Sequence, residues 1–237
     1  MKASAVIVCA GYGRRLGKID KAVLELEGKP LFYYAVKTFA GIDEIKEIVL
    51  VLRKKHLRAA RVLIPHSYHN KKVFFVEGGA RRQDSVCKGL AAVSSSVDNV
   101  LIHDGARPFI SNRVIKNILN KLKKSEAVIC GVKVPDTVKI VEKGIVKKTV
   151  ERDNLYLIQT PQGFRRQLIL TAYEQFGASN VTDDSSMLES LGYKVEVVKG
   201  DELNMKITYP QDIALAEAII KRVKGQGSRG KKTLNIM

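Results

Sequence analysis

Short apolar runs rich in β-branched residues alternate along the chain with segments of helical periodicity, and this alternation restricts the fold more than any other feature. The runs predict strands over residues 3–11, 46–53, 72–79, 99–106 and 126–134. Helical spacing of apolar residues predicts helices over residues 31–41, 81–93 and 111–124, the last with Ser111 as N-cap. Nearly continuous apolar strands are typical of a parallel sheet covered on both faces. The sequence therefore predicts an α/β fold, a Rossmann-like three-layer α/β/α sandwich with a mainly parallel sheet.

The alternation breaks near Pro135. The following residues predict two short strands that turn at Lys143-Gly144 and have few large apolar side chains. Because a two-stranded ribbon is marginal by itself, we expect this projecting β-arm, about residues 135–153, to pack on its own domain or on a second subunit. The α/β pattern then resumes, with a helix from about Arg165 and a closing helix after Pro210. We expect one domain over residues 1–223 and a basic flexible tail over 224–237.

A net charge of +17 indicates either nucleic-acid binding or a phosphate-bearing substrate. The end of the chain contributes to this charge without any acid, through Lys221, Arg222, Lys224, Arg229, Lys231 and Lys232. Three widely spaced cysteines without a CxxC pair favour reduced thiols and a cytoplasmic protein. No apolar run reaches the roughly 20 residues that cross a bilayer, and His66 and His69 alone make a poor metal site.

A glycine-rich, cationic loop, CAGYGRRLGKIDK, follows the first predicted strand. Glycines at the end of a strand allow backbone amides to approach a phosphate chain closely. The loop fits neither the dinucleotide fingerprint GxGxxG nor a P-loop, since its glycine spacing is longer and no Gly-Lys-Ser/Thr closes it. What it offers is backbone donors next to fixed positive charge, a combination that suits a triphosphate under attack.

Polar clusters also follow the other predicted strands, where the ligand crevice of such a fold lies. HDGARP places Asp104 and Arg107 there, and GGARRQDS leads through Gly79 into a helix start. Further clusters occur in VPDTVK, TVERD, TPQGF and NMKIT. His103 neighbours Asp104, but strand alternation points it away from the crevice, so we do not expect it to act as a general base.

Taken in order, CAGYGRRLG, GGARRQDSV, HDGARP, VPDTVK, TVERD, TPQGF, VTDD and NMKIT resemble the 2-C-methyl-D-erythritol 4-phosphate cytidylyltransferases of isoprenoid biosynthesis. The resemblance extends from Ala5 to about Ala218, and HDGARP with TPQGF is its most specific part. It implies transfer of CMP from CTP to the acceptor's phosphate, with release of pyrophosphate. It also implies Mg²⁺ held mainly by the CTP phosphates, and a homodimer joined through the arm.

The resemblance further assigns roles by motif position. The implied catalytic cations are Arg15, Lys21 and Lys206. The implied nucleotide-binding residues are Ala10, Gly11 and Gly13 at the phosphates, Gly79, Arg82 and Ser85 at the cytosine, and Asp104 and Ala106 near the ribose and metal. The implied acceptor-binding residues are Arg107, Asp136, Thr137, Arg152, Thr160 and Thr182, with Thr137 and Arg152 reaching the partner's site. No direct protein ligand to the metal is expected, with Asp104 as the possible exception.

The chain departs from the family pattern at one point: Ile19-Asp20-Lys21 stands where Pro-Lys-Gln is usual, after a shorter gap. Asp20 would weaken the positive field around Lys21. Two other functions stay open from the sequence. A ribitol-5-phosphate cytidylyltransferase shares most of these motifs. A basic nucleic-acid-binding protein would fit the charge, but it predicts more than the 6% aromatic residues found here.

Overall fold

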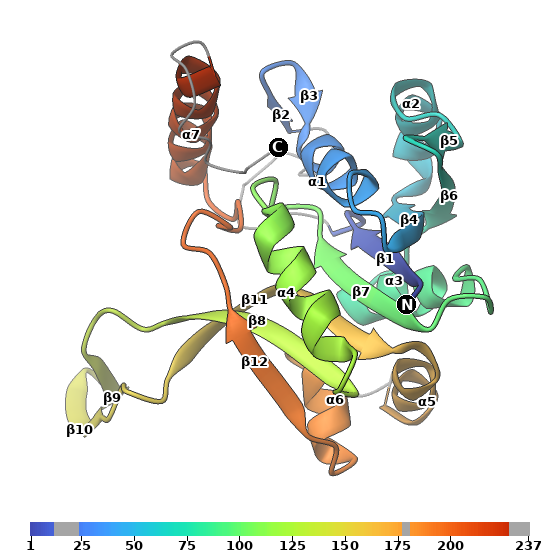
Figure 1. Ribbon diagram of the computed structural model, residues 1–237. Helices are drawn as coiled ribbons and strands as arrows, with labels where there is room; N and C mark the ends of the chain where they lie inside the picture. Colours follow the sequence, from blue (N-terminus) through green and yellow to red (C-terminus); the bar gives the residue numbers. More distant parts are fainter. Residues whose placement is uncertain (12–23, 177–180, 228–237) are drawn as a thin grey trace.

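The computed structural model describes residues 1–11, 24–176 and 181–227 of the chain. Its centre is an eight-stranded sheet (Figure 1). From edge to edge the strands are β12 (Val195–Lys199), β8 (Ala127–Lys133), β11 (Tyr156–Arg165), β7 (Asn99–Asp104), β1 (Ala3–Val8), β4 (Ile45–Leu52), β6 (Lys71–Glu77) and β5 (Ser67–Tyr68). Only β11 and β5 run antiparallel to their neighbours in this sheet, among the described residues. The five predicted strands and the mainly parallel sheet are confirmed.

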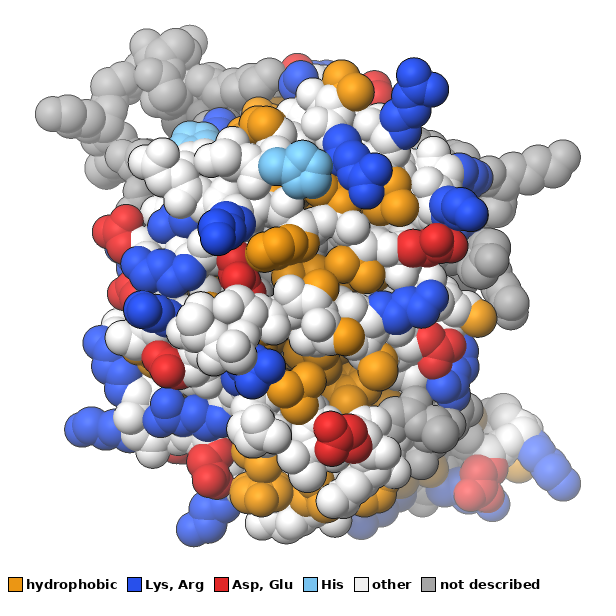
Figure 2. All heavy atoms as spheres, turned by 90° about the vertical axis from the view of Figure 1, so that its right-hand side faces the viewer, with side chains coloured by type: hydrophobic (Ala, Val, Ile, Leu, Met, Phe, Trp, Pro, Cys, Tyr) orange, Lys and Arg blue, Asp and Glu red, His pale blue; other side chains and the backbone are white. Residues whose placement is uncertain are grey.

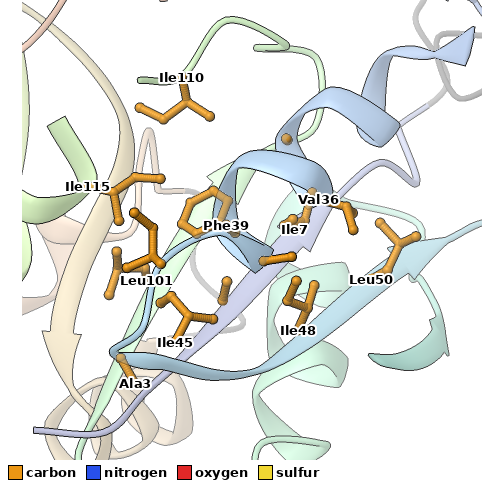
Figure 3. Packing of buried hydrophobic residues seen from close by; sticks show 14 of the residues in the cluster. Ala3, Ile7, Val36, Phe39, Ile45, Ile48, Leu50, Leu101, Ile110 and Ile115 are labelled. Atoms are coloured by element: carbon orange, nitrogen blue, oxygen red, sulfur yellow. The ribbon is translucent and has the colours of Figure 1, made fainter. Parts of the chain in front are cut away.

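Helices cover both faces of the sheet and complete the predicted three layers. One face packs against α1 (Leu31–Ala40), α2 (Lys54–Leu63) and α4 (Asn112–Leu122). The opposite face packs against α3 (Arg82–Ala91), α5 (Arg166–Phe176) and α6 (Ser185–Ser190). Phe39 of α1 lies among Ile7, Leu101 and Ile115, and so joins the helix to β1, β7 and α4 (Figure 3). Burying a side chain of this size stabilises a fold by about 1.5–3 kcal/mol.

Two details of the helices differ from the sequence prediction. Ser111 is the N-cap residue of α4, but its hydroxyl does not cap a backbone amide; it lies 3.4 Å from Oδ2 of Asp201 instead. The helix α2 was not predicted. Only Ala60 of α2 is fully buried, because the helix lies near the edge of the sheet and exposes most of its surface.

The closing helix α7 (Gln211–Gly227) packs beside a short hairpin made of β2 (Glu25–Leu26) and β3 (Lys29–Pro30). A small separate core joins them, with Leu26, Phe109, Ile207 and Ala216 buried. The helix runs through the predicted domain boundary at residue 223, and most of the predicted tail lies outside the described residues. The division of the chain into one domain and a tail stays a prediction.

The predicted arm is present and extends away from the sheet (Figure 1). It consists of β9 (Val138–Glu142) and β10 (Ile145–Val150), which pair only with each other, antiparallel. Lys143 and Gly144 form the turn with φ of 50° and 80°, as a two-residue hairpin with two left-handed positions requires. Most of the apolar side chains of the arm are exposed, among them Ile145 at 64%.

Lys and Arg side chains are spread over the side of the molecule that carries α2, β5 and β6, where they outnumber acidic side chains (Figure 2). None of the described helices is long and apolar enough to span a membrane.

Candidate active site

The sheet order reverses between β1 and β7, and this reversal places the crevice. From β1 the chain continues outward to β4 and β6 on one side, and then returns to β7 on the other side of β1. In open α/β sheets, ligands bind beyond the carboxyl ends of the strands at such a switch point. The side chain of Cys9 lies against Gly105 at the two strand ends: a Cβ atom on Gly105 would lie 1.9 Å from Sγ of Cys9. A larger residue at this position would therefore displace the side chain of Cys9.

The glycines after β6 bring a second predicted segment to the end of β1. A Cβ atom on Gly78 would lie 2.2 Å from the Cβ atom of Ala10, so the two backbones are in close contact. The amide of Gly79 donates to Oγ of Ser85 at 3.0 Å, which ties this loop to the first turns of α3. Ala10, Gly79 and Ser85, all predicted at the nucleotide, therefore lie together. Gly11 follows Ala10, and its carbonyl accepts a hydrogen bond from Arg53.

Asp104 ends β7 and lies between two cations. Nε of Arg82 donates to its Oδ1 at 3.0 Å, and Nζ of Lys206 donates to its Oδ2 at 2.6 Å. Burial alone would raise the pKa of Asp104, but the charges of Arg82 and Lys206 hold it well below its usual range. The carboxylate is therefore ionised at neutral pH. Lys206 arrives here because the amide of Ile207 donates to the carbonyl of Ala106 at 2.9 Å.

Two buried side chains, those of His103 and Thr160, lie next to Asp104. Oγ of Thr160 accepts a hydrogen bond from the amide of Asp104 at 3.0 Å and lies 3.2 Å from Nδ1 of His103. Nε2 of His103 lies 3.1 Å from the carbonyl of Arg107. Burial lowers the pKa of His103 to about 4, so the ring is neutral. As expected from alternation, its ring packs on Phe39 at 5.3 Å, on the α1 side of the sheet.

Arg107 contacts Asp104 and also lines a hollow of about 430 Å³. Its amide donates to the carbonyl of Asp104 at 2.9 Å, and its Nη1 donates to the carbonyl of Asn204 at 2.8 Å. The hollow is lined by Arg107, Val132, Lys133, Pro135, Leu157, Ile158, Gln159 and Glu202. Apolar walls with a few polar and charged groups are typical of a site for a small ligand.

The remaining predicted residues are exposed or lie outside the described residues. Asp136, Thr137 and Arg152 are exposed at the base of the arm, where Nη1 of Arg152 donates to the carbonyl of Pro135. Thr182 is exposed in the loop before α6. Gly13, Arg15 and Lys21 lie outside the described residues, as does the unusual Ile19-Asp20-Lys21 sequence.

Sequence reasoning missed the residue that holds the other side of Arg82. Nη1 and Nη2 of Arg82 donate to the two carboxylate oxygens of Asp184, at 2.9 and 2.7 Å. Tyr173 also donates to Asp184, at 2.6 Å. The only available signal was the pair of adjacent acids in VTDD, from which Thr182 alone was selected.

Asp104 is a poor site for a metal bound by the protein alone. Each of its oxygens already accepts a hydrogen bond from a cation. Within the described part of the chain, His, Cys, Asp and Glu form no group of three or more that could hold a metal ion. These residues fit a cation that arrives on a phosphate ligand, with Asp104 at most as one additional partner.

A doubly wound sheet with glycine-rich strand ends, fixed cations and one carboxylate at its switch point defines an α/β protein that binds phosphate-bearing ligands. Residues 3–222 match the family model IspD, 2-C-methyl-D-erythritol 4-phosphate cytidylyltransferase. The chain therefore belongs to this family, as its motifs indicated.

Individual members of the family match this chain over nearly their whole length. The chain is 42% identical to the 2-C-methyl-D-erythritol 4-phosphate cytidylyltransferase of Clostridium novyi, over 94% of this chain and 98% of that protein. The crystal structure of 4-diphosphocytidyl-2C-methyl-D-erythritol synthase from Anaerococcus prevotii matches with a TM-score of 0.82 and 37% identity, over 93% of this chain and 99% of that one. A 2-C-methyl-D-erythritol 4-phosphate cytidylyltransferase from Thermus thermophilus matches with a TM-score of 0.76 and 32% identity, over 93% and 100%.

Proposed function

We propose that the protein transfers CMP from CTP to the phosphate of 2-C-methyl-D-erythritol 4-phosphate and releases pyrophosphate. The observation that carries this proposal is the family match over residues 3–222. Relatives that match over nearly their whole length are named for this activity. Membership of an enzyme family also favours this function over the basic nucleic-acid-binding protein that the net charge left open.

In the proposed reaction, an oxygen of the acceptor phosphate attacks the α-phosphorus of CTP in line. A bond forms between that oxygen and the α-phosphorus, while the bond from the α-phosphorus to the leaving pyrophosphate oxygen breaks. A phosphate monoester has a second pKa of about 6, so most of it is already dianionic at neutral pH and needs no general base. The protein therefore has to align two anions and offset the charge that grows on the α-phosphate.

The crevice provides groups for both tasks. Ala10, Gly11 and Gly79 would surround the nucleotide with backbone groups, and Lys206 would offset negative charge on the α-phosphate. Arg107 would bind the acceptor phosphate, because it contacts Asp104 and lines the hollow beside it. Ala106 and Ser85 would border the nucleotide, and Thr160 and Thr182 the acceptor. Gly13, Arg15 and Lys21 keep their proposed roles at the triphosphate, although they lie outside the described residues.

Mg²⁺ would be held mainly by the phosphates of CTP, where it neutralises part of their charge. We also propose a cytoplasmic homodimer in which Asp136, Thr137 and Arg152 at the base of the arm contribute to the acceptor site of the partner. The exposed apolar side chains of the arm support an interface between subunits. The proposed nucleotidyltransferase domain covers residues 1–223.

A product assay tests the function. The protein is incubated with CTP, Mg²⁺ and either 2-C-methyl-D-erythritol 4-phosphate or ribitol 5-phosphate, and pyrophosphate release is measured while the product is identified by mass spectrometry. We expect the cytidine diphosphate ester of methylerythritol, with little turnover of ribitol 5-phosphate. Faster turnover of ribitol 5-phosphate, or no turnover of either acceptor, would overturn the proposal.

A further inference from the structure

Four charged side chains of alternating sign form a row that begins in the crevice and ends in the interior. Lys206 contacts Asp104, Asp104 contacts Arg82, and Arg82 contacts Asp184. They come from four separate parts of the chain: the segment before α7, the end of β7, the first turn of α3 and the residue before α6. Formally the four charges cancel, so the row needs no further ion to be neutral.

The two ends of the row differ in burial. The side chain of Asp184 is 0% exposed, whereas those of Arg82 and Lys206 are 31% and 35% exposed. Tyr173, also buried, donates to Oδ1 of Asp184, which accepts from Nη1 of Arg82 as well. The Asp184 end is therefore fixed by packing, and the Lys206 end faces the site where the substrates are proposed to bind.

All three nitrogens of the Arg82 guanidinium bind carboxylates, two of them on Asp184 and one on Asp104. A guanidinium prefers two parallel hydrogen bonds to one carboxylate, and here Asp184 provides that pair. With the guanidinium held in this orientation, Arg82 reaches Asp104 through Nε at Oδ1, and Oδ2 of Asp104 accepts a hydrogen bond from Lys206.

We propose that Asp184 is a positioning residue for the transfer reaction: by holding both Nη atoms of Arg82, it fixes the orientation of the guanidinium, so that Nε meets one oxygen of Asp104 and the other oxygen is left to Lys206. The proposal rests on the function proposed above. It gives the second acid of VTDD a role that acts through Arg82, without contact between Asp184 and either substrate.

Removal of the charge on Asp184 would leave Arg82 with one carboxylate partner. An uncompensated buried charge is costly, so we expect the guanidinium to turn towards Asp104, its remaining carboxylate partner. Two hydrogen bonds from Arg82 to Asp104 would then compete with Lys206 for Oδ2. Lys206 would lose its fixed position, and the loss would appear mainly in kcat because the misplaced cation acts on the transition state.

The neighbouring acid provides a matched control. Asp183 accepts hydrogen bonds from Gln162, Ser185 and the amide of Ser186, and it belongs to the same turn as Asp184. Within the described part of the chain, Arg82 is not among the hydrogen-bond partners of Asp183. Asp183→Asn and Asp184→Asn therefore perturb the same turn, but only Asp184→Asn removes the carboxylate that binds Arg82.

We expect Asp184→Asn to lower kcat about tenfold to a hundredfold, as a small misplacement of a catalytic group does, and Asp183→Asn to stay within about twofold of the wild type. Steady-state kinetics with CTP and 2-C-methyl-D-erythritol 4-phosphate give kcat and KM, and urea unfolding gives the stability of each variant. If Asp184→Asn does not fold, Tyr173→Phe is measured instead, with an expected smaller loss of kcat in a folded protein.

A double-mutant cycle identifies the route of the effect. In an Arg82→Met background, Asp184→Asn should cause no further loss of kcat, because Arg82 is the residue through which it acts. A full additional loss in that background, or equal kcat for the Asp183 and Asp184 variants, would overturn the inference. With Tyr173→Phe as the substitute, an unchanged kcat would do the same. An inactive wild type would instead overturn the proposed function.

Discussion

Lys206 and Asp104 are separated by 102 positions in the sequence, yet Nζ of the lysine lies 2.6 Å from Oδ2 of the aspartate. The contact joins the segment before α7 to the end of β7, at the switch point of the sheet. Asp104 therefore holds a cation at the crevice before any substrate binds. Because a preorganised cation needs little rearrangement during the reaction, Lys206 is well suited to stabilise charge that develops on a phosphate.

We expect Lys206→Ala to lower kcat about a hundredfold to a thousandfold, as loss of one preorganised contact to developing charge does. Asp104 keeps Arg82 as a partner, so the variant should remain folded. Steady-state pyrophosphate release measures the effect. Lys116→Ala, which removes an exposed lysine from the surface of α4, is the control and should leave kcat unchanged. Near-normal kcat in Lys206→Ala would contradict a catalytic role for this lysine.

His103 predicts a specific pH dependence of stability. Its pKa is about 4 in the folded protein, below the ordinary value of 6.5, because burial disfavours the charged ring. The folded protein binds the proton of His103 less readily than the unfolded chain does. The free energy of unfolding is therefore highest above about pH 6.5 and falls by about 3 kcal/mol in total as the pH falls towards 4. Urea unfolding between pH 7 and 4 should show this loss, and His103→Gln should show a flatter profile. Equal slopes in the two proteins would count against the prediction.

The sequence was sufficient to predict the elements whose pattern is local. Nearly continuous apolar runs gave the strands correctly, and Lys143-Gly144 gave the turn of the arm because few residues adopt positive φ. The position of the crevice followed from the fold class, since parallel strands end at one edge. In contrast, α2 is rich in Lys and Arg and has one fully buried residue, and it was not predicted.

The missed part of the site depends on contacts between distant segments. Arg82 and Asp184 are 102 positions apart, and His103 and Thr160 are 57 apart. No spacing rule relates such residues, because the path of the chain between them decides whether they meet. The sequence showed that Arg82 follows a glycine pair, but only the folded chain shows that it binds two carboxylates.

If the arm forms the proposed subunit interface, we expect a single charged substitution in it to disrupt the dimer. Ile145 is 64% exposed in the arm, and an aspartate at an apolar interface is left without a partner. Multi-angle light scattering at micromolar concentration should give the mass of a dimer for the wild type and of a monomer for Ile145→Asp. Val62→Asp is the control, because Val62 of α2 is 85% exposed and lies outside the arm. A monomeric wild type would contradict the proposed dimer.

The contact between Gly105 and Cys9 predicts a substitution that one further change repairs. A Cβ atom on Gly105 would lie 1.9 Å from Sγ of Cys9, so Gly105→Ala displaces the Cys9 side chain and disturbs the packing at the ends of β1 and β7. We expect a loss of about 1–3 kcal/mol in the free energy of unfolding, as is common for overpacking, together with lower turnover because Asp104 shifts. Adding Cys9→Ala removes the sulfur and should restore most of the lost stability and most of the lost turnover. Gly11→Ala, where nothing lies within 4 Å, should change stability little. Urea unfolding and turnover of the three variants test the prediction, which fails if Cys9→Ala does not relieve the effect of Gly105→Ala.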